Sequence, residues 1–313
     1  MGLFKSFLKL FKRERTVADL AKWLDVPQPE LREWLSNRPT WTLGYEYTRF
    51  TIPKRRGGTR TIEAPNDKLK ALQRRILHRL LNPLPMHPAV TGFVRGRSIV
   101  DNARPHMGRG VVINLDLADF FPTITAERVV TMFRALGWDA DAAAILSRIC
   151  TNEGHLPQGA PTSPAISNLV CRKLDERLSG LINRYQGQYT RYADDITISL
   201  AGLGRNKRLR RHKGKKTLSR PRFASRSLLT LVRQIVEEEG FRIQMKKRVR
   251  VQRAHQRQTA TGLIVNQAVN LPRATRRRIR AMQHRQRLGQ LDDAGQKRLR
   301  GWESLLSMID QQR

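Results

Sequence analysis

Cysteine is scarce in this 313-residue sequence: only Cys150 and Cys171 occur, both within apolar stretches of helical pattern. Two such residues exclude a disulfide framework and a cysteine metal cluster, and they are typical of a reducing cytosol. The sequence has no apolar run long enough to cross a membrane and no internal repeat. We therefore expect a cytoplasmic globular protein without a membrane partner.

Acidic residues are also few, since 26 Asp and Glu stand against 60 Lys and Arg, a formal net charge of +34. This charge attracts polyanions, with nucleic acid as the first candidate and an anionic membrane as the second. With 39% hydrophobic residues, the chain can still bury a large core, divided into two or three subdomains. Against this background, the adjacent acids Asp194 and Asp195 in RYADDITIS predict either a solvated turn or a site for cations.

The N-terminal stretch MGLFKSFLKLFKRER reads as a basic amphipathic helix. Its apolar stripe is expected to dock on protein rather than on a membrane, and it consists of Phe4, Phe7, Leu8 and Phe11. A capping box at Thr16 and Asp19 then predicts a pair of short helices around a proline turn. This pair resembles a DNA-binding helix-turn-helix, but a helical extension packed on the main body is the favoured alternative.

Further along, a hairpin is predicted around KRRGG, and a buried strand from Val111 to Leu115 runs into Asp116. Ser163 is the predicted N-cap of a helix that has Pro164 in its first turn. The stretch YTRYADDITISL reads as strand, turn and strand, with both aspartates in the turn. Short strands are expected at FRIQM and TGLIV, a basic insert at residues 203–226, and two basic helices at residues 272–288 and 294–309.

Asp116 and the Asp194–Asp195 turn can be neighbours in one sheet. Three clustered carboxylates stay ionised only with cations, and hard divalent ions prefer oxygen ligands. Two Mg²⁺ ions held there can activate an attacking hydroxyl and stabilise a leaving pyrophosphate. The basic hairpin can then neutralise a triphosphate.

The segments YADD, LPQGAPTSP and LDLADFF resemble, in order and spacing, the palm motifs of reverse transcriptases. The resemblance implies an α+β right-hand polymerase fold with fingers, a palm and a small helical thumb, preceded by a helical N-terminal extension. The expected boundaries are residues 1–40 for the extension, 41–108 for the fingers, 109–268 for the palm and 269–313 for the thumb.

The same resemblance implies roles for individual residues. Asp116, Asp194 and Asp195 would be the catalytic, metal-binding acids. Phe121 would crowd a ribose 2′-OH and so favour dNTPs. The remaining nucleotide-binding residues would be Lys54, Arg60, Gln158, Gly159 and Lys247.

Two further stretches resemble the bacterial retron branch: NARPH, with Asn102 and His106, and ATGL, with Thr261 and Gly262. In that branch these regions lie near the enzyme's own structured RNA, and thumb arginines grip the heteroduplex; here these are Arg276, Arg277, Arg278 and Arg280.

The implied enzyme is an RNA-directed DNA polymerase of the bacterial cytoplasm. It copies part of a cognate noncoding RNA into single-stranded DNA primed from an RNA 2′-OH, which leaves a branched RNA–DNA product. The implied setting is antiphage defence with a separate effector protein. Two alternatives stay open: a reverse transcriptase of another bacterial branch, such as a group II intron or abortive-infection type, and a non-catalytic RNA-binding protein, for which the charge alone would suffice.

Overall fold

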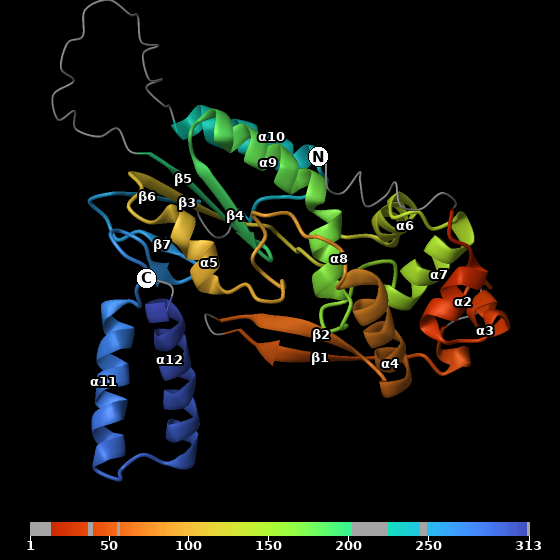
Figure 1. The fold of residues 1–313 in the computed structure, drawn as a ribbon, viewed down its shortest axis with the longest axis horizontal. Coiled ribbons are helices and arrows are strands. Elements are labelled where there is room, and N and C mark those ends of the chain that lie inside the picture. Colours follow the sequence, from red (N-terminus) through yellow and green to blue (C-terminus); the bar gives the residue numbers. More distant parts are fainter. Residues whose placement is uncertain (1–13, 37–39, 55–56, 202–224, 245–248, 312–313) are drawn as a thin grey trace, which may run out of the picture. The chain divides into compact units, whose positions relative to one another are not determined.

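The computed structural model describes residues 14–36, 40–54, 57–201, 225–244 and 249–311 (Figure 1). The phenylalanine stripe of the N-terminus and nearly all of the basic insert lie outside these residues. Contacts divide the chain into two compact units, one formed by Met1–His87 with Asp119–Lys173 and the other by Pro88–Ala118 with Leu174–Arg313. Each unit therefore combines segments that are distant in the sequence.

The first unit is a set of helices around a β-hairpin. Its helices are α2 (Val17–Leu24), α3 (Gln28–Glu33), η1 (Thr40–Leu43), α4 (Asp67–Ile76) with the π-turn η2 (Leu77–Leu81), α6 (Ala126–Ala135), α7 (Ala140–Cys150) and α8 (Ser163–Val170). The hairpin pairs β1 (Tyr47–Pro53) with β2 (Thr59–Pro65) in antiparallel register.

The predicted pair of short helices is confirmed as α2 and α3. The Thr16 backbone N–H donates to the Asp19 carboxylate at 2.9 Å, which completes the predicted capping box. Leu20, Leu24 and Leu31 are fully buried against the unit. Arg75 of α4 also donates to the Leu24 carbonyl at 2.7 Å, so the pair packs on the body.

The second unit contains an antiparallel sheet in the order β4-β5-β3-β6. Its strands are β3 (Val111–Asp116), β4 (Gln188–Tyr192), β5 (Asp195–Leu200) and β6 (Arg250–Arg253). The predicted strand–turn–strand around YADD is confirmed, with Asp194 in the turn and Asp195 already in β5.

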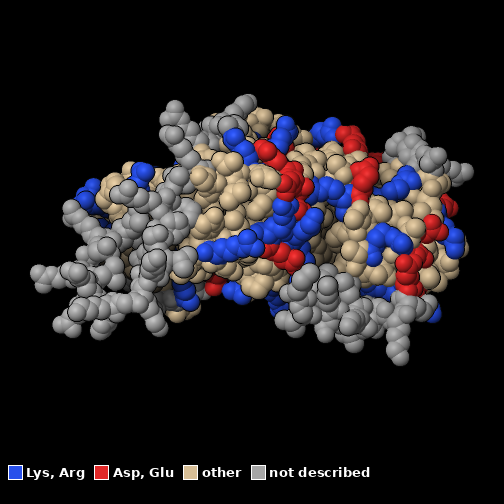
Figure 2. Space-filling model, turned by 90° about the horizontal axis from the view of Figure 1, so that it is seen from above, with Lys and Arg blue, Asp and Glu red and all other residues tan. Residues whose placement is uncertain are grey.

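Helices cover both faces of this sheet (Figure 1). On one face lie α9 (Arg172–Arg184) and α10 (Ser225–Glu238), and on the other lie α5 (Ile99–Ala103) and the 3₁₀ turn η3 (Arg104–His106). Arg177 of α9 forms ion pairs with Glu238 and, at 2.7 Å, with Glu239. Figure 2 likewise shows acidic side chains among the basic ones on the face seen from above, so this face is not uniformly basic.

The last part of the second unit is a helical hairpin on a small sheet. The elements are β7 (Thr259–Ala260), β8 (Leu263–Ile264), α11 (Arg273–Arg287) and α12 (Asp293–Gln311). The two predicted basic helices are thereby confirmed within one or two residues. Their apolar side chains, among them Ile279 and Leu299, share a core with Ala260 and Leu263.

Two local predictions are wrong. Helix α8 begins at Ser163, and Thr162 is its N-cap, because the Ser163 hydroxyl donates to the Pro157 carbonyl at 2.6 Å and ties the preceding loop instead. At FRIQM, the described residues form a single bridge between Ile243 and Leu117 rather than a strand. No helix among the described residues is long and apolar enough to span a membrane, and both cysteines are buried and in the thiol form.

A buried ion pair connects α9 to strand β4. The Asp175 carboxylate accepts hydrogen bonds from Arg191 Nε at 2.8 Å and Nη2 at 2.7 Å, and both side chains are fully buried. The Tyr189 hydroxyl adds a third bond to Asp175 at 2.6 Å. Arg191 Nη1 also donates to the Ala193 carbonyl at 3.1 Å, which extends the support into the turn that holds the aspartates.

We predict that Asp175→Ala lowers the free energy of unfolding by about 3–5 kcal/mol, since it leaves the Arg191 charge buried without a counter-ion. Denaturant unfolding measures the loss. Glu176→Ala, an exposed acid on the same helix, is the matched control and should cost less than about 1 kcal/mol. Equal losses in the two variants would contradict the assigned importance of the buried pair.

Candidate active site

The three predicted acids meet at one end of the sheet. Asp116 is the last residue of β3 and stands opposite Asp195, the first residue of β5. Asp194 occupies the turn between β4 and β5, and its main-chain carbonyl accepts a hydrogen bond from Leu117 N at 2.9 Å. On the other side of β3, Gln244 N donates to the Asp116 carbonyl at 2.8 Å, so neighbouring backbone holds this corner from two directions.

The turn itself is conformationally strained. Ala193 has φ 57, a left-handed conformation that is uncommon for residues other than glycine. Such outliers persist only where the surroundings enforce them, and they gather at functional sites. Here the enforcement comes from the Arg191 guanidinium and from Gly92, where an added Cβ would lie 2.5 Å from the Ala193 nitrogen.

Divalent cations are the natural partners of this corner, because carboxylate oxygens are the ligands that Mg²⁺ prefers. The cross-strand pair of Asp116 and Asp195 fits this chemistry. In the part of the chain that the structure describes, no three His, Cys, Asp or Glu side chains gather closely enough to hold a metal ion. The carboxylates therefore provide the donor type, but not a closed set of three ligands.

Asn102 and His106 lie on the face of the sheet that α5 and η3 cover, opposite to α9 and α10, and both are fully buried. His106 Nδ1 is 2.7 Å from the Ser199 hydroxyl, and Nε2 is 2.8 Å from the Thr190 hydroxyl. Burial, aided by the charge of Arg109, lowers the pKa of His106 to about 3 and keeps the ring neutral. The direct RNA contact predicted for His106 conflicts with this placement, because both ring nitrogens already bind the sheet.

Asn102 conflicts with the prediction of a direct RNA contact in the same way. Its Oδ1 accepts a hydrogen bond from the Thr91 hydroxyl at 2.8 Å, and its main-chain carbonyl accepts one from the Thr190 hydroxyl at 3.3 Å. Its buried Nδ2 has no acceptor among the described residues. Asn102 and His106 hold segments 91–106 to the sheet.

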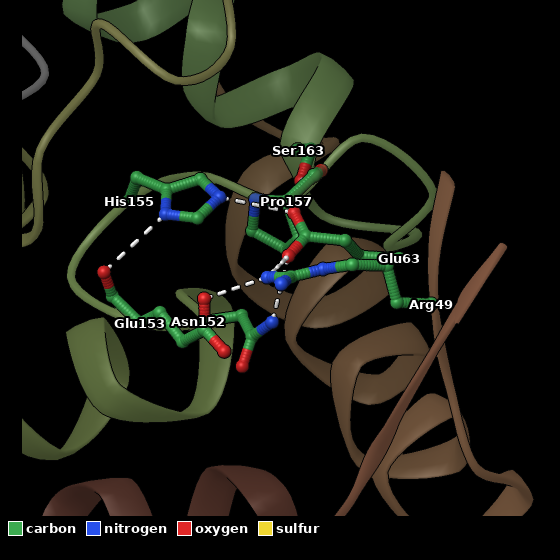
Figure 3. Close-up of polar contacts among 7 residues, drawn as sticks. All are labelled: Arg49, Glu63, Asn152, Glu153, His155, Pro157 and Ser163. Carbon is green, nitrogen blue, oxygen red and sulfur yellow. Dashed lines mark hydrogen bonds and ion pairs between the residues drawn. The ribbon is translucent and has the colours of Figure 1, made fainter. Parts of the chain in front are cut away.

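In the first unit, a polar cluster holds the predicted nucleotide-binding loop against the β-hairpin (Figure 3). Its centre is the buried Glu63 of β2, which accepts hydrogen bonds from Arg49 at 2.9 Å, Asn152 at 2.8 Å and His155 at 3.0 Å. Burial opposes ionisation of Glu63, but these hydrogen bonds outweigh it and hold its pKa below the ordinary value.

Gln158 and Gly159 sit directly on this hairpin. Glu63 N donates to the Gln158 carbonyl at 3.0 Å. Gly159 has φ 146, and an added Cβ would lie 2.6 Å from the Glu63 carbonyl oxygen. Only glycine therefore fits at position 159 without moving the backbone.

The other predicted nucleotide-binding residues are placed as follows. Lys54 is exposed at the hairpin turn, where its N–H donates to the Gly58 carbonyl at 2.9 Å. Arg60 is exposed on β2, opposite Ile52. Phe121 is half-buried with its ring centroid 5.3 Å from that of Phe120. Lys247 lies outside the described residues.

The predicted RNA-binding residues of the C-terminal region are accessible. Thr261 and Gly262 form the turn between β7 and β8, with φ 45 and 83, and the Thr261 hydroxyl donates to the Ile99 carbonyl at 3.1 Å. On α11 the exposed side chains include Arg276, Arg277, Arg278 and Arg280.

Sequence reasoning missed the residues that support these sites. Asp175 stands in an ordinary polar helix pattern, KLDERL, and Glu63 in an edge strand. Gly92 precedes the exposed loop of residues 93–97. Their partners lie far away in the chain, so no local pattern could have identified them. For Asp175, the only signal is an acid positioned among the apolar residues Leu174 and Leu178.

Comparison with known proteins decides the family. The profile of the family "Reverse transcriptase (RNA-dependent DNA polymerase)" matches residues 52–267. The Retron Mx65 reverse transcriptase of Myxococcus xanthus is 40% identical over 95% of this chain and 69% of that protein. The Retron Ec86 reverse transcriptase of Escherichia coli is 34% identical over 86% of this chain and 78% of that protein. The chain belongs to the bacterial retron reverse transcriptases.

This retron reverse transcriptase is thus an RNA-directed DNA polymerase, as the sequence motifs predicted. The Retron Mx162 reverse transcriptase of M. xanthus is also 39% identical over 93% of the chain, and the chain spans 63% of that protein. The family profile ends at residue 267, before α11, whereas the Mx65 similarity covers 95% of the chain. The retron similarity therefore extends beyond the general polymerase region into α11 and α12.

We predict that the stability of the wild-type reverse transcriptase decreases as the pH falls from 6.5 toward 3, partly through His106. Below pH 6.5 His106 binds a proton in the unfolded state. In the folded state it stays neutral until the pH approaches its lowered pKa of about 3. Replacing His106 with Gln removes this titration. The free energy of unfolding is measured between pH 7 and pH 4. As the pH falls, it should decrease more steeply in the wild type than in the variant, by up to about 1.4 kcal/mol per pH unit. Parallel curves would contradict the buried, neutral ring.

We also predict that Gly159→Ala destabilises the first unit more than Gly154→Ala does. Both glycines have positive φ, but nothing lies within 4 Å of a Cβ added at Gly154. Both variants bear the conformational strain, while only Gly159→Ala forces the loop away from β2, an additional loss of about 1–3 kcal/mol. Thermal or denaturant unfolding measures the difference, and equal losses would show that the loop adapts freely.

Proposed function

We propose that this retron reverse transcriptase uses Asp116, Asp194 and Asp195 to copy part of a cognate noncoding RNA into single-stranded DNA. The observation that carries the proposal is the cross-strand pairing of Asp116 with Asp195, with Asp194 in the adjoining strained turn. A polymerase needs closely spaced carboxylates at the point where the primer hydroxyl attacks the dNTP.

In this proposal, each group of side chains has its own chemical role. The three carboxylates would hold two Mg²⁺ ions, and these would supply activation of the attacking hydroxyl and charge neutralisation of the leaving pyrophosphate. Lys54 and Arg60, both exposed on the β1–β2 hairpin, neutralise the triphosphate. Phe121 limits the space for a ribose 2′-OH, and the Gln158–Gly159 loop lines the nucleotide.

We further propose that synthesis starts from a 2′-OH within the noncoding RNA, so that the product is a branched RNA–DNA molecule. The support is the similarity to Retron Mx65 and Retron Ec86 reverse transcriptases over most of the chain. The exposed arginines of α11 and the β7–β8 turn at Thr261 and Gly262 would contact the RNA and the heteroduplex. Antiphage defence with a separate effector protein is the proposed setting.

We expect Asp194→Asn to reduce dNTP incorporation on an RNA template at least about a thousandfold, because several kcal/mol of transition-state stabilisation are lost. Primer extension with the purified protein measures the rate, and fluorescence anisotropy measures RNA affinity, which should remain unchanged. Asp141→Asn makes the same exchange at an exposed position of α7 and should leave extension at the wild-type rate. Extension that survives Asp194→Asn would refute the assignment.

The branched product is tested by purifying the protein with its nucleic acid from cells that carry the native locus. A discrete single-stranded DNA, joined to RNA until a debranching enzyme is added and absent from Asp194→Asn cells, is the expected result. DNA that requires Asp194 but carries no branch would retain the polymerase and reject the 2′-OH priming.

A further inference from the structure

The segment 91–97 lies directly beside the catalytic hairpin and has no role in the proposed function. Thr91 N donates to the Arg191 carbonyl at 3.0 Å, and Arg191 N donates to the Ala89 carbonyl at 2.9 Å, so the segment runs along β4. The next residue, Gly92, is so close to the turn that an added Cβ would clash with the Tyr192 and Ala193 backbone. Segment and turn therefore form one rigid piece.

Beyond Gly92, the chain exposes an aromatic ring. Phe93 has φ 61, a conformation that is a genuine outlier for a bulky residue. It also keeps 45% of its surface exposed, although burial is the usual fate of phenylalanine. Its ring centroid lies 6.5 Å from that of Tyr192, at an interplanar angle of 40°. Backbone strain and exposure together place an apolar ring next to the catalytic aspartates.

Two positively charged residues follow this ring in the same loop. Arg95 and Arg97 are exposed, and Gly96, with φ 74, turns the loop between them. The loop is closed by a hydrogen bond from Arg97 N to the Val94 carbonyl at 3.1 Å, and it ends at Ser98, whose hydroxyl caps α5. Aromatic rings flanked by arginines bind nucleic acid by stacking on bases and pairing with phosphates.

We propose that residues 93–97 form a nucleobase platform, in which Phe93 stacks on a base of the substrate and Arg95 and Arg97 hold the adjoining phosphates. The proposal rests on the proposed function for the position of the chemistry. Because Gly92 and Thr91 fix the loop to the hairpin, a base stacked on Phe93 is held in register with Asp194 and Asp195. Asn102 and His106 act behind it as positioning residues.

The test uses a DNA primer annealed to an RNA template, with the fluorescent base 2-aminopurine either at the primer 3′ end or at a template position near it. Stacking quenches this fluorophore. Binding of the full chain without dNTPs should quench one of the two probes, and the position of that probe identifies the strand on the platform. Phe93→Leu should abolish the quenching and weaken binding at least about fivefold, and Phe93→Trp should restore both.

Leu231→Ala is the matched control, because it removes an exposed apolar side chain on α10 and should leave quenching and affinity unchanged. If Phe93→Leu melts at a lower temperature, Phe93→Asn, which tolerates positive φ, replaces it in the comparison. Identical quenching and affinity in the wild type and the ring-less variant would overturn the platform.

The same measurements in Asp194→Asn separate the two proposals, since they need no chemistry. If primer extension is independent of Asp194 while Phe93 still governs quenching, the catalytic assignment fails and the platform stands. If extension requires Asp194 but quenching ignores Phe93, the platform fails and the polymerase stands.

Discussion

The buried ion pair between Asp175 and Arg191 is the interaction on which the acidic corner of Asp116, Asp194 and Asp195 depends. A fully buried guanidinium is tolerated only when its charge and its donors are satisfied. The bonds of Arg191 include two to the Asp175 carboxylate, which balances its charge, and one to the Ala193 carbonyl. Separating the pair would cost free energy. Because Arg191 also binds the Ala193 carbonyl, the intact pair opposes relaxation of the strained Ala193 turn.

Successive side chains of strand β4 point to opposite faces of the sheet and bind partners on both faces. Tyr189 and Arg191 point toward Asp175 on α9, while Thr190 between them points to His106 on η3. Successive side chains of a strand face opposite sides, so one short strand connects both helical layers. Polar partners on both faces fix the register of β4, because a one-residue slip would bury Arg191 opposite His106 and leave Asp175 without its partner.

Local pattern was enough to predict the buried strand before Asp116, the YADD hairpin and the two basic C-terminal helices, since each depends on periodicity or turn chemistry within a few residues. The motif residues Asn102 and His106 were predicted to lie near the RNA, because NARPH resembles the Asn-Ala-x-x-His motif of the retron branch. Their burial depends on Thr91, Thr190 and Ser199, which only the folded sheet brings near. The N-cap of α8 differed by one residue because the Ser163 hydroxyl binds the Pro157 carbonyl of the preceding loop instead.

The burial of Asn102 and His106 changes where recognition can occur. Side chains that are fully enclosed read no RNA, so any retron-specific contribution from NARPH passes through the backbone that these residues hold in place. On one side, Asn102 binds the Thr91 hydroxyl next to Gly92. On the other side, the Ile99 carbonyl accepts a hydrogen bond from the Thr261 hydroxyl. One buried motif therefore connects the hairpin that carries Asp194 and Asp195 with the β7–β8 turn. Under the proposed function, recognition of a structured RNA would fall to the exposed residues that this scaffold positions, not to the motif's own side chains.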